Sequence, residues 1–211
     1  MYVPSRFKDQ GDEQVEEIIR QFPLATVISV DNGSPFVSHL PLLLQKNEKG
    51  LVLVGHLAVA NPHAKKLASG PVTAIFHGPN TYITPSWYSI NNVPTWSYVV
   101  VHVRGRVEMI HDEAGVVECV RHLSDTMEKT SKNPWEFWIP DDLQNGVLEK
   151  AIAGFRIHVE NINAKFKLSQ QHPELERKRV IDALKTDRAD EASHSVAQWM
   201  AQTKSVHKTS T

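Results

Sequence analysis

The chain has 211 residues, of which 41% are hydrophobic, and its 23 lysines and arginines nearly balance its 24 aspartates and glutamates. That composition predicts one sizeable core and excludes a broad basic surface, so we expect any DNA contact to be weak or made through a partner. The single cysteine (Cys119), an N-terminus without a signal-peptide pattern and the lack of any run near the roughly 18 apolar residues of a membrane span indicate a soluble cytoplasmic protein.

The first part of the chain predicts one helix followed by strands. Apolar residues recur at helical spacing over residues 12–22, and Pro23 ends that pattern. Residues 25–30 are rich in β-branched side chains and run into an Asp-Asn-Gly turn signal, so they are predicted to form a hairpin with residues 35–44. A third strand is predicted over residues 51–55.

The middle of the chain predicts a short helix and three more strands. The helix is expected to begin at Asn61-Pro62 and to end near Gly70, because Asn caps helices well and Pro suits the first helical position. Strands over residues 72–77 and 80–84 flank a turn predicted at Gly78-Pro79. Residues 96–109 form the longest predicted strand, with polar and aromatic side chains on one face and valines on the other.

The remaining residues predict a helix over 112–129, a last strand over 154–166 and a charged helical segment beyond Pro173. The run at residues 174–179 mixes both signs of charge, which favours a solvated helix face over a DNA-reading helix. Mostly antiparallel strands with few helices favour a mainly β (α+β) barrel or sandwich over a parallel α/β sheet.

No catalytic or metal-binding constellation stands out. Histidines at positions 39, 56, 63, 77 and 102 fall in one part of the chain, but HxH, HxxxH and HExxH spacings are absent, so we predict no metal site. The motifs GxGxxG, GxxxxGK[ST] and GxSxG are absent as well. Cys119 lies in an amphipathic segment, where a small half-buried residue is favoured over a nucleophile. We therefore predict no catalytic residues.

Three features allow ligand binding, each beside a plainer interpretation. Residues 55–63 lead from a strand end into a predicted helix start, which is either a phosphate seat or an ordinary turn. Aromatic residues gather between Tyr82 and Tyr98, where a flat ring can stack or where core and interface packing is sufficient. Lys165 and Lys167 share one face of the last strand, either to meet an anion or as a solvated pair.

A series of ordered motifs carries a resemblance to the PaiB family. The resemblance covers about residues 1–185, and the motifs are long and specific. They are MYVP at 1–4, SHLP at 38–41, GHLA and ANPH within 55–63, FHGPNTYITPSWY at 76–88, VPTW at 93–96, YVVVHVRGR at 98–106 and AKFKLSQ at 164–170.

The resemblance implies an antiparallel split β-barrel that binds FMN, is related to pyridoxamine phosphate oxidases, forms homodimers and acts as a negative transcriptional regulator. It implies a split-barrel domain over residues 1–170 and a helical extension over 171–211. Its motifs assign flavin-lining roles to His39, Leu40, Pro41 and Leu42, phosphate-proximal positions to His56, Leu57, Ala58, Asn61 and His63, and closure of the pocket to Trp87 and Trp96.

The chain departs from the family pattern beside the expected phosphate. Val59 stands where the pattern has Arg, and Ala64 stands where it has Trp. We therefore expect FMN to bind more weakly than is usual in the family. The favoured role is a non-catalytic sensor of a ligand or redox state that regulates transcription. The alternatives are an FMN-dependent oxidoreductase acting on a small molecule and a cofactor-free interaction protein.

Overall fold

The computed structural model describes residues 1–8, 11–48, 50–140 and 147–206. The α-helices are α1 (Asp12–Gln21), α2 (Glu113–Glu128), α3 (Leu148–Ala151), α4 (Glu174–Thr186) and α5 (Glu191–Gln202). The strands are β1 (Leu24–Asp31), β2 (Ser34–Pro41), β3 (Leu43–Asn47), β4 (Gly50–Ala58), β5 (Pro71–Ile83), β6 (Thr95–Ile110) and β7 (Ile152–Lys167). Short 3-10 helices are η1 (Ser5–Phe7), η2 (Pro62–Lys65), η3 (Leu67–Ser69) and η4 (Pro85–Trp87).

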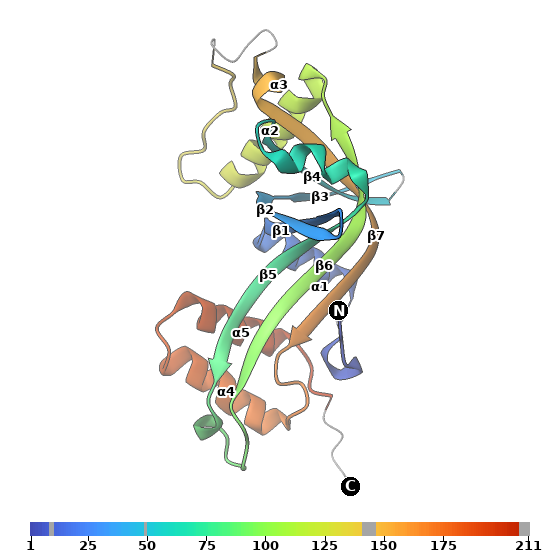
Figure 1. Ribbon diagram of the computed structural model, residues 1–211. Coiled ribbons are helices and arrows are strands. Elements are labelled where there is room, and N and C mark those ends of the chain that lie inside the picture. The colour runs from blue at the N-terminus through green and yellow to red at the C-terminus, as the bar shows by residue number, and fades with distance from the viewer. Residues whose placement is uncertain (9–10, 49, 141–146, 207–211) are drawn as a thin grey trace. The chain divides into compact units, whose positions relative to one another are not determined.

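The strands form one seven-stranded sheet in the order β2-β1-β5-β6-β7-β4-β3 (Figure 1). Strand β1 pairs antiparallel with β2 and β5, and β4 pairs antiparallel with β3 and β7. Sequential neighbours such as β1 and β2 are joined by the predicted turn, where Asn32 and Gly33 adopt positive φ angles of 50° and 80°. The predicted mainly β, antiparallel architecture is confirmed.

The described residues gather into two compact units. The first contains the described parts of 1–21, 77–101 and 163–211, and the second those of 22–76 and 102–162. Strands β5, β6 and β7 each contribute residues to both units. In the second unit, α2 packs through Val116 and Cys119 on buried residues of β4 and β6.

The predicted strand over residues 35–44 is wrong in one respect, because it is two strands. Strand β2 ends at Pro41, which has no N–H to continue the ladder. The N–H of Leu42 then donates to the carbonyl oxygen of Pro23 at 2.9 Å. The next residues form β3, whose partner is β4 and not β1.

The predicted turn at Gly78-Pro79 is also wrong, because β5 runs through both residues without a break. Gly78 serves close packing at this point. A Cβ atom there would lie 3.0 Å from Cβ of Val99 and 3.3 Å from Cδ1 of Ile18. The missing side chain therefore brings neighbouring elements together within the first unit, and the reversal of the chain occurs at residues 84–94 instead.

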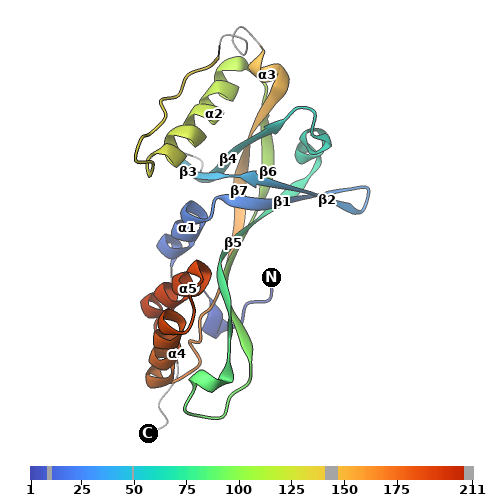
Figure 2. The same ribbon diagram turned by 90° about the vertical axis from the view of Figure 1, so that its left-hand side faces the viewer.

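Helices α4 and α5 lie side by side in the first unit (Figure 2). The predicted solvated face is confirmed for the exposed residues 174, 175, 178 and 179, but not for the two residues between them. Glu176 and Arg177 are buried, with exposed fractions of 3% and 1%. The Arg177 guanidinium donates to the carbonyl oxygens of Met200 and Thr203, both at 2.6 Å, and to Glu174 at 2.9 Å. It thereby satisfies carbonyls at the C-terminal end of α5 that have no partner within the helix.

Replacing Arg177 with Ala is expected to lower the free energy of unfolding by about 2–4 kcal/mol, because buried helix-end carbonyls lose charge-assisted hydrogen bonds. Urea denaturation measures the change. Lys178→Ala, at the neighbouring exposed position, is the control and is expected to change stability by less than about 0.5 kcal/mol. Equal stabilities of the two variants would contradict the role of Arg177.

Candidate functional site

The segment expected to hold a phosphate begins a 3-10 helix and not the longer helix predicted to Gly70. Asn61 caps η2 as predicted, since its Oδ1 accepts the N–H of His63 at 3.0 Å. However, η2 and η3 are separate short turns, so few peptide dipoles align there. The N–H groups of Val59, Asn61 and Ala64 donate to backbone carbonyls. Anion binding at this segment therefore depends on side chains.

His63 is the structural centre of this segment. Its ring is fully buried, with its Nε2 2.9 Å from Oγ of Ser29 and its Nδ1 2.8 Å from Oγ of Ser38. Asn61 Nδ2 also donates to Ser38 Oγ at 3.4 Å. A neutral imidazole has one donor and one acceptor nitrogen, and hydroxyl groups serve both. His63 thus ties η2 to β1 and β2 and has no ring nitrogen left for a ligand.

The surroundings of His63 favour its neutral form. Burial lowers its pKa below the ordinary value, and the positive charge of Lys66 lowers it further. Lys66 forms an ion pair with Asp31 and lies 5.5 Å from the ring centroid of Phe36, which packs against the imidazole at 4.7 Å. The serine partners were missed from the sequence, although a polar residue at a buried strand position such as Ser29 was an available signal.

His56, on β4, has an incompletely satisfied ring. Burial lowers its pKa, and its buried Nδ1 has no hydrogen-bond partner among the described residues. An orphaned ring nitrogen of this kind fits a site that a polar ligand completes. Next to it, Leu57 is buried whereas Ala58 and Val59 are exposed at the strand end. The predicted phosphate-proximal residues are thus brought together in the second unit, with different degrees of access.

The residues expected to line the flavin lie at the end of β2 and directly after it, and their burial alternates along the chain. Leu40 and Leu42 are buried, whereas His39 is exposed and Pro41 is half-buried. A period of two along a strand points successive side chains to opposite faces. A ligand on the open face of this strand therefore meets His39 and Pro41, while the leucines pack in the core.

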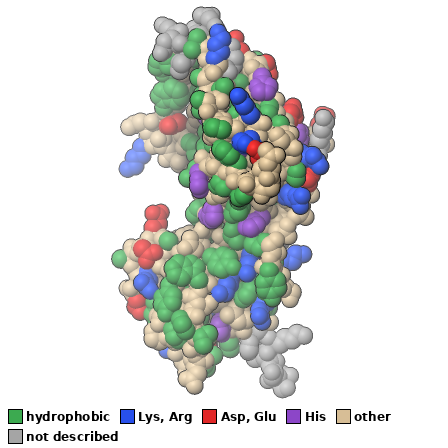
Figure 3. All heavy atoms as spheres, in the orientation of Figure 1, with side chains coloured by type: hydrophobic (Ala, Val, Ile, Leu, Met, Phe, Trp, Pro, Cys, Tyr) green, Lys and Arg blue, Asp and Glu red, His purple; other side chains and the backbone are tan. Residues whose placement is uncertain are grey.

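Trp87 and Trp96 belong to the first unit. Trp87 ends η4, and Trp96 lies near the start of β6, with half of its surface exposed (50%) and its Nε1 donating to Oδ1 of Asn80 at 3.2 Å. Hydrophobic side chains gather over the lower stretches of β5 and β6 (Figure 3). A concavity of about 350 Å³ opens here, lined by His77, Gly78, Asn80, Trp96, Tyr98, Val99 and Val100.

Lys165 and Lys167 do not form the solvated pair that was the default interpretation. Both are half-buried on β7. The Lys165 Nζ lies 5.4 Å from the ring centroid of Tyr98 and 5.7 Å from that of Tyr2, and the Lys167 Nζ donates to Oγ1 of Thr95 at 2.6 Å. The positive charge of Lys165 therefore lies beside Tyr98, an aromatic wall of the concavity.

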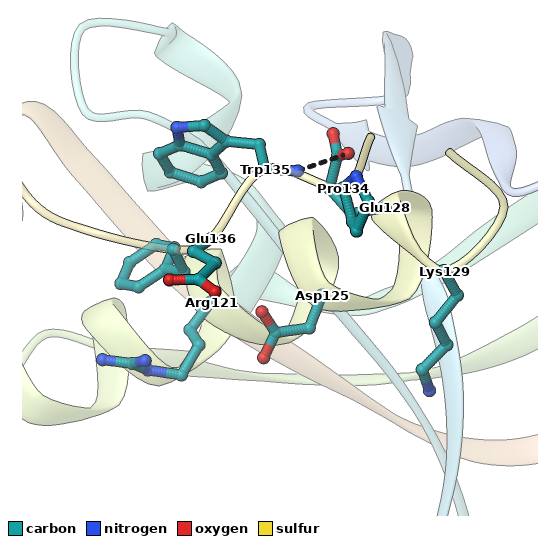
Figure 4. A pocket seen from close by; sticks show the side chains of 8 residues that line it. Arg121, Asp125, Glu128, Lys129, Pro134, Trp135 and Glu136 are labelled. Atoms are coloured by element: carbon teal, nitrogen blue, oxygen red, sulfur yellow. Dashed lines mark hydrogen bonds between the residues drawn. The ribbon is translucent and has the colours of Figure 1, made fainter. Parts of the chain in front are cut away.

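A larger concavity of about 490 Å³ lies in the second unit, between α2 and residues 134–137 (Figure 4). Its lining includes the carboxylates of Asp125, Glu128 and Glu136, against the cations of Arg121 and Lys129. Glu128 accepts the N–H of Trp135 at 2.9 Å, which holds the outer wall to the helix. This excess of carboxylates opposes the binding of a phosphate dianion in this concavity.

Other chemistry finds little support in the described part of the chain. No group of three His, Cys, Asp or Glu side chains there is placed to hold a metal ion. Cys119 is buried, and burial raises the pKa of its thiol, which disfavours the nucleophilic thiolate. Within the same residues, every helix is too short or too polar to cross a membrane.

Comparisons of sequence show a family and its relatives. The family model described as "Putative FMN-binding domain" matches residues 1–161. Protease synthase and sporulation protein PAI 2 of Bacillus subtilis is 35% identical over 190 residues, which cover 89% of this chain and 90% of that protein. An uncharacterized protein of Emericella nidulans is 26% identical over 224 residues, with 86% of this chain and 89% of that protein covered.

Comparisons of structure concern the fold. The flavocytochrome Anf3 of Azotobacter vinelandii superposes with a TM-score of 0.60 at 21% identity, covering 76% of this chain and 69% of that one. The FAD and heme binding protein of Mycobacterium smegmatis superposes with a TM-score of 0.59 at 16% identity, covering 76% and 73%. The predicted split-barrel fold of flavoproteins is confirmed.

The buried neutral state of His63 predicts a loss of stability in acid. Its pKa in the folded protein lies below the unfolded value of about 6.5, so the unfolded chain binds the proton more readily and stability falls as the pH drops below about 6.5. Urea denaturation between pH 7.5 and 5.5 is expected to show a smaller decline in His63→Asn than in the wild type. The exposed His111→Asn is the control, and identical slopes in wild type and His63→Asn would contradict the assignment.

Proposed function

The chain belongs to the FMN-binding domain family of PaiB-like proteins, as its motifs predicted, and we propose that it binds FMN and acts as a negative transcriptional regulator in the cytoplasm. The 35% identity with the Bacillus subtilis sporulation protein over 89% of this chain carries the proposal. We further propose that the bound flavin serves to sense a ligand or redox state, without a catalysed reaction of its own. FMN supplies a ring system that accepts and returns electrons.

Within the first unit alone, the concavity on β5 and β6 offers a surface on which a flat conjugated ring would pack. Trp96 offers an exposed aromatic surface and Tyr98 a second one, beside the cation of Lys165. Flat conjugated rings pack well against such side chains, and a nearby cation favours electron-rich ring edges. The role of Trp87 in closing the pocket stays a prediction. Its carbonyl oxygen accepts a hydrogen bond from Arg179, and its ring lies 5.7 Å from the guanidinium of Arg188.

In the second unit, the phosphate-proximal assignment rests on side chains at the end of β4 and in η2. The orphaned Nδ1 of His56 lies there, and so does the half-buried amide of Asn61, which accepts the N–H of His63 and donates one N–H to Ser38. His63 contributes by holding the segment against β1 and β2, since both its ring nitrogens are engaged. The N–H groups of η2 add little, because most of them already donate within the protein.

Val59→Arg is expected to tighten FMN binding by roughly ten- to a hundredfold, because a charge-assisted hydrogen bond to a phosphate contributes about 1.5–3 kcal/mol. Val59 is 42% exposed at the end of β4, so a longer side chain fits without repacking the core. Titration of the FMN-free protein, followed by quenching of flavin fluorescence, measures the affinity. Lys65→Ala, at an exposed position of η2, serves as a comparison for the cation already present.

The titration also decides the proposed cofactor. Wild-type protein that neither quenches flavin fluorescence nor shifts the flavin absorbance bands at saturating FMN would refute FMN binding. Equal affinities of the wild type and Val59→Arg would place position 59 away from the phosphate. Rapid flavin reduction by a nicotinamide cofactor coupled to turnover of a small molecule would support an oxidoreductase in place of a sensor.

A homodimer is part of the proposal, and an exposed apolar face of the second unit supports it. Leu24 and Val30 of β1 and Val37 of β2 are 60%, 62% and 47% exposed on one side of the sheet. The register places Val37 opposite Ile28, and Val30 opposite Pro35, so these side chains form a contiguous apolar patch. Leu24 lies on the same side of β1, beyond the pair of Thr26 and His39. A symmetric contact between copies buries such a patch on both partners at once.

Sedimentation at micromolar concentration is expected to give twice the 23.8 kDa mass of the chain. Val37→Lys is expected to shift the protein toward the single-chain mass, because a buried lysine in the contact is costly. Val93→Lys, at an exposed apolar position of the first unit, is the control. A wild-type species with the mass of a single chain would overturn the proposed dimer.

Regulation is proposed to act on DNA indirectly or weakly. The chain has a formal net charge of −1, and specific sites are typically held at roughly 10⁻⁸ M or tighter. Retention of a promoter fragment at that affinity by the pure protein, in the presence of competitor DNA, would replace this view with direct operator binding.

A further inference from the structure

The connection between β5 and β6, residues 84–94, is held to the C-terminal helix α4 by one carboxylate. Glu176 Oε2 accepts the backbone N–H of Ser89 at 2.8 Å, and Glu176 Oε1 accepts the Ser89 hydroxyl. Glu176 lies 87 residues further along the chain and is only 3% exposed. The acid therefore fixes both the backbone and the side chain of a distant connection at a single point.

Apolar packing holds the connection at Tyr88, which is 7% exposed with its ring centroid 4.9 Å from that of His172, but it contributes little beyond that residue. Ile90 and Val93 are 49% and 70% exposed, so about half of the Ile90 side chain and most of the Val93 side chain stay in water. Polar contacts surround the tip instead: Asn92 Nδ2 lies 3.4 Å from Nε2 of His172, and Arg179 donates to the carbonyl oxygen of Trp87 at 3.2 Å. Beyond Tyr88, the position of the connection depends on a few hydrogen bonds, among them those to the buried carboxylate of Glu176.

Glu176 is committed to this task. The guanidinium of the neighbouring Arg177 donates hydrogen bonds to Glu174 and to carbonyl oxygens at the end of α5. In the described part of the chain, no ion pair joins Arg177 to Glu176. The hydrogen bond from the Ser89 hydroxyl lowers the pKa of the Glu176 carboxyl below its ordinary value. The group is therefore a carboxylate at neutral pH, and a carboxylate accepts stronger hydrogen bonds than a neutral acid.

The connection leads directly into the wall of the concavity on β5 and β6. Thr95 follows it and is held by Lys167, and Trp96 comes next with its half-exposed ring at the concavity. Tyr82, at the other end of the connection, packs near Trp96 with ring centroids 6.3 Å apart. A displacement of the connection would therefore change where the Trp96 ring lies.

We infer that Glu176 is a positioning residue of the flavin site, which holds the Ser89 connection so that Trp96 presents its ring to the flavin. This inference rests on the proposed FMN binding. It gives α4, in the helical C-terminal segment, a specific role in the same unit as the concavity. Pre-organisation of a stacking residue improves affinity because the ligand does not have to order the residue itself.

Glu176→Gln tests the inference with nearly unchanged side-chain size. We expect FMN affinity to fall about fivefold or more, in line with the loss of a hydrogen bond to a charged group. Ser89→Ala removes the hydroxyl partner only and is expected to cause a smaller loss. Asp182→Asn, at an exposed position of the same helix, is the matched control and is expected to bind FMN as the wild type does.

A double-mutant cycle with Trp96→Leu separates positioning from general stability. If Glu176 acts through Trp96, then Glu176→Gln has little further effect on FMN affinity in the Trp96→Leu background. Glu176→Gln alone should also shift the flavin absorbance bands relative to the wild type. The double variant should show the same bands as Trp96→Leu alone. Full additivity of the two substitutions, or wild-type affinity of Glu176→Gln, would overturn the inference.

Hydrogen exchange without FMN keeps this inference distinct from the cofactor proposal. In the FMN-free protein, amides of residues 86–93 are expected to exchange faster in Glu176→Gln than in Asp182→Asn or the wild type. Unchanged exchange would refute the anchoring role of Glu176 even if FMN binds. Faster exchange in a protein that does not bind FMN would retain the anchor and refute both the proposed cofactor and the flavin role of Glu176.

Discussion

The hydrogen-bond ladder of long antiparallel strands imposes a period of two on their side chains, and both the core and the candidate site depend on that period. On β6, Val99, Val101 and Val103 are buried, whereas Trp96 and Tyr98 on the other face border the concavity, which Val99 also reaches. A shift of one residue in register would exchange these faces, bringing aromatic and polar groups into the core. The strand therefore fixes the hydrophobic core and the ligand-facing surface together.

Outside the sheet, hydrogen bonds of buried polar side chains hold several connections and helix ends in place. His63 holds η2 to β1 and β2 through two serine hydroxyls, Arg177 satisfies the end of α5, and Glu176 holds the Ser89 connection. Each of these side chains is almost completely withdrawn from water. Buried polar groups are costly unless they are paired, so these networks specify one arrangement of the connections more sharply than apolar contacts would.

The same features explain why cofactor affinity is expected to be modest. The phosphate-proximal segment offers short 3-10 turns with engaged N–H groups, and Val59 stands where the family pattern has a cation. Only a few polar side chains then remain to attract an anion. Such a site would let the proposed flavin exchange with the medium, so its occupancy would vary with the FMN concentration.

The sequence by itself determined the order of helices and strands, the antiparallel sheet and family membership, because local periodicity and ordered motifs are properties of neighbouring residues. It also predicted that Asn61 caps a helical turn and that the valines of β6 share one face of the strand. The tertiary structure decided that this face is the buried one. The sequence did not reveal the break at Pro41 or the continuity of β5 through Gly78, since each depends on a partner outside the segment: Pro23 in one case, Val99 and Ile18 in the other. Only the tertiary structure decided that His63 is satisfied by Ser29 and Ser38 and that Glu176 binds Ser89, because contacts between residues far apart in sequence leave no periodic signal in either segment.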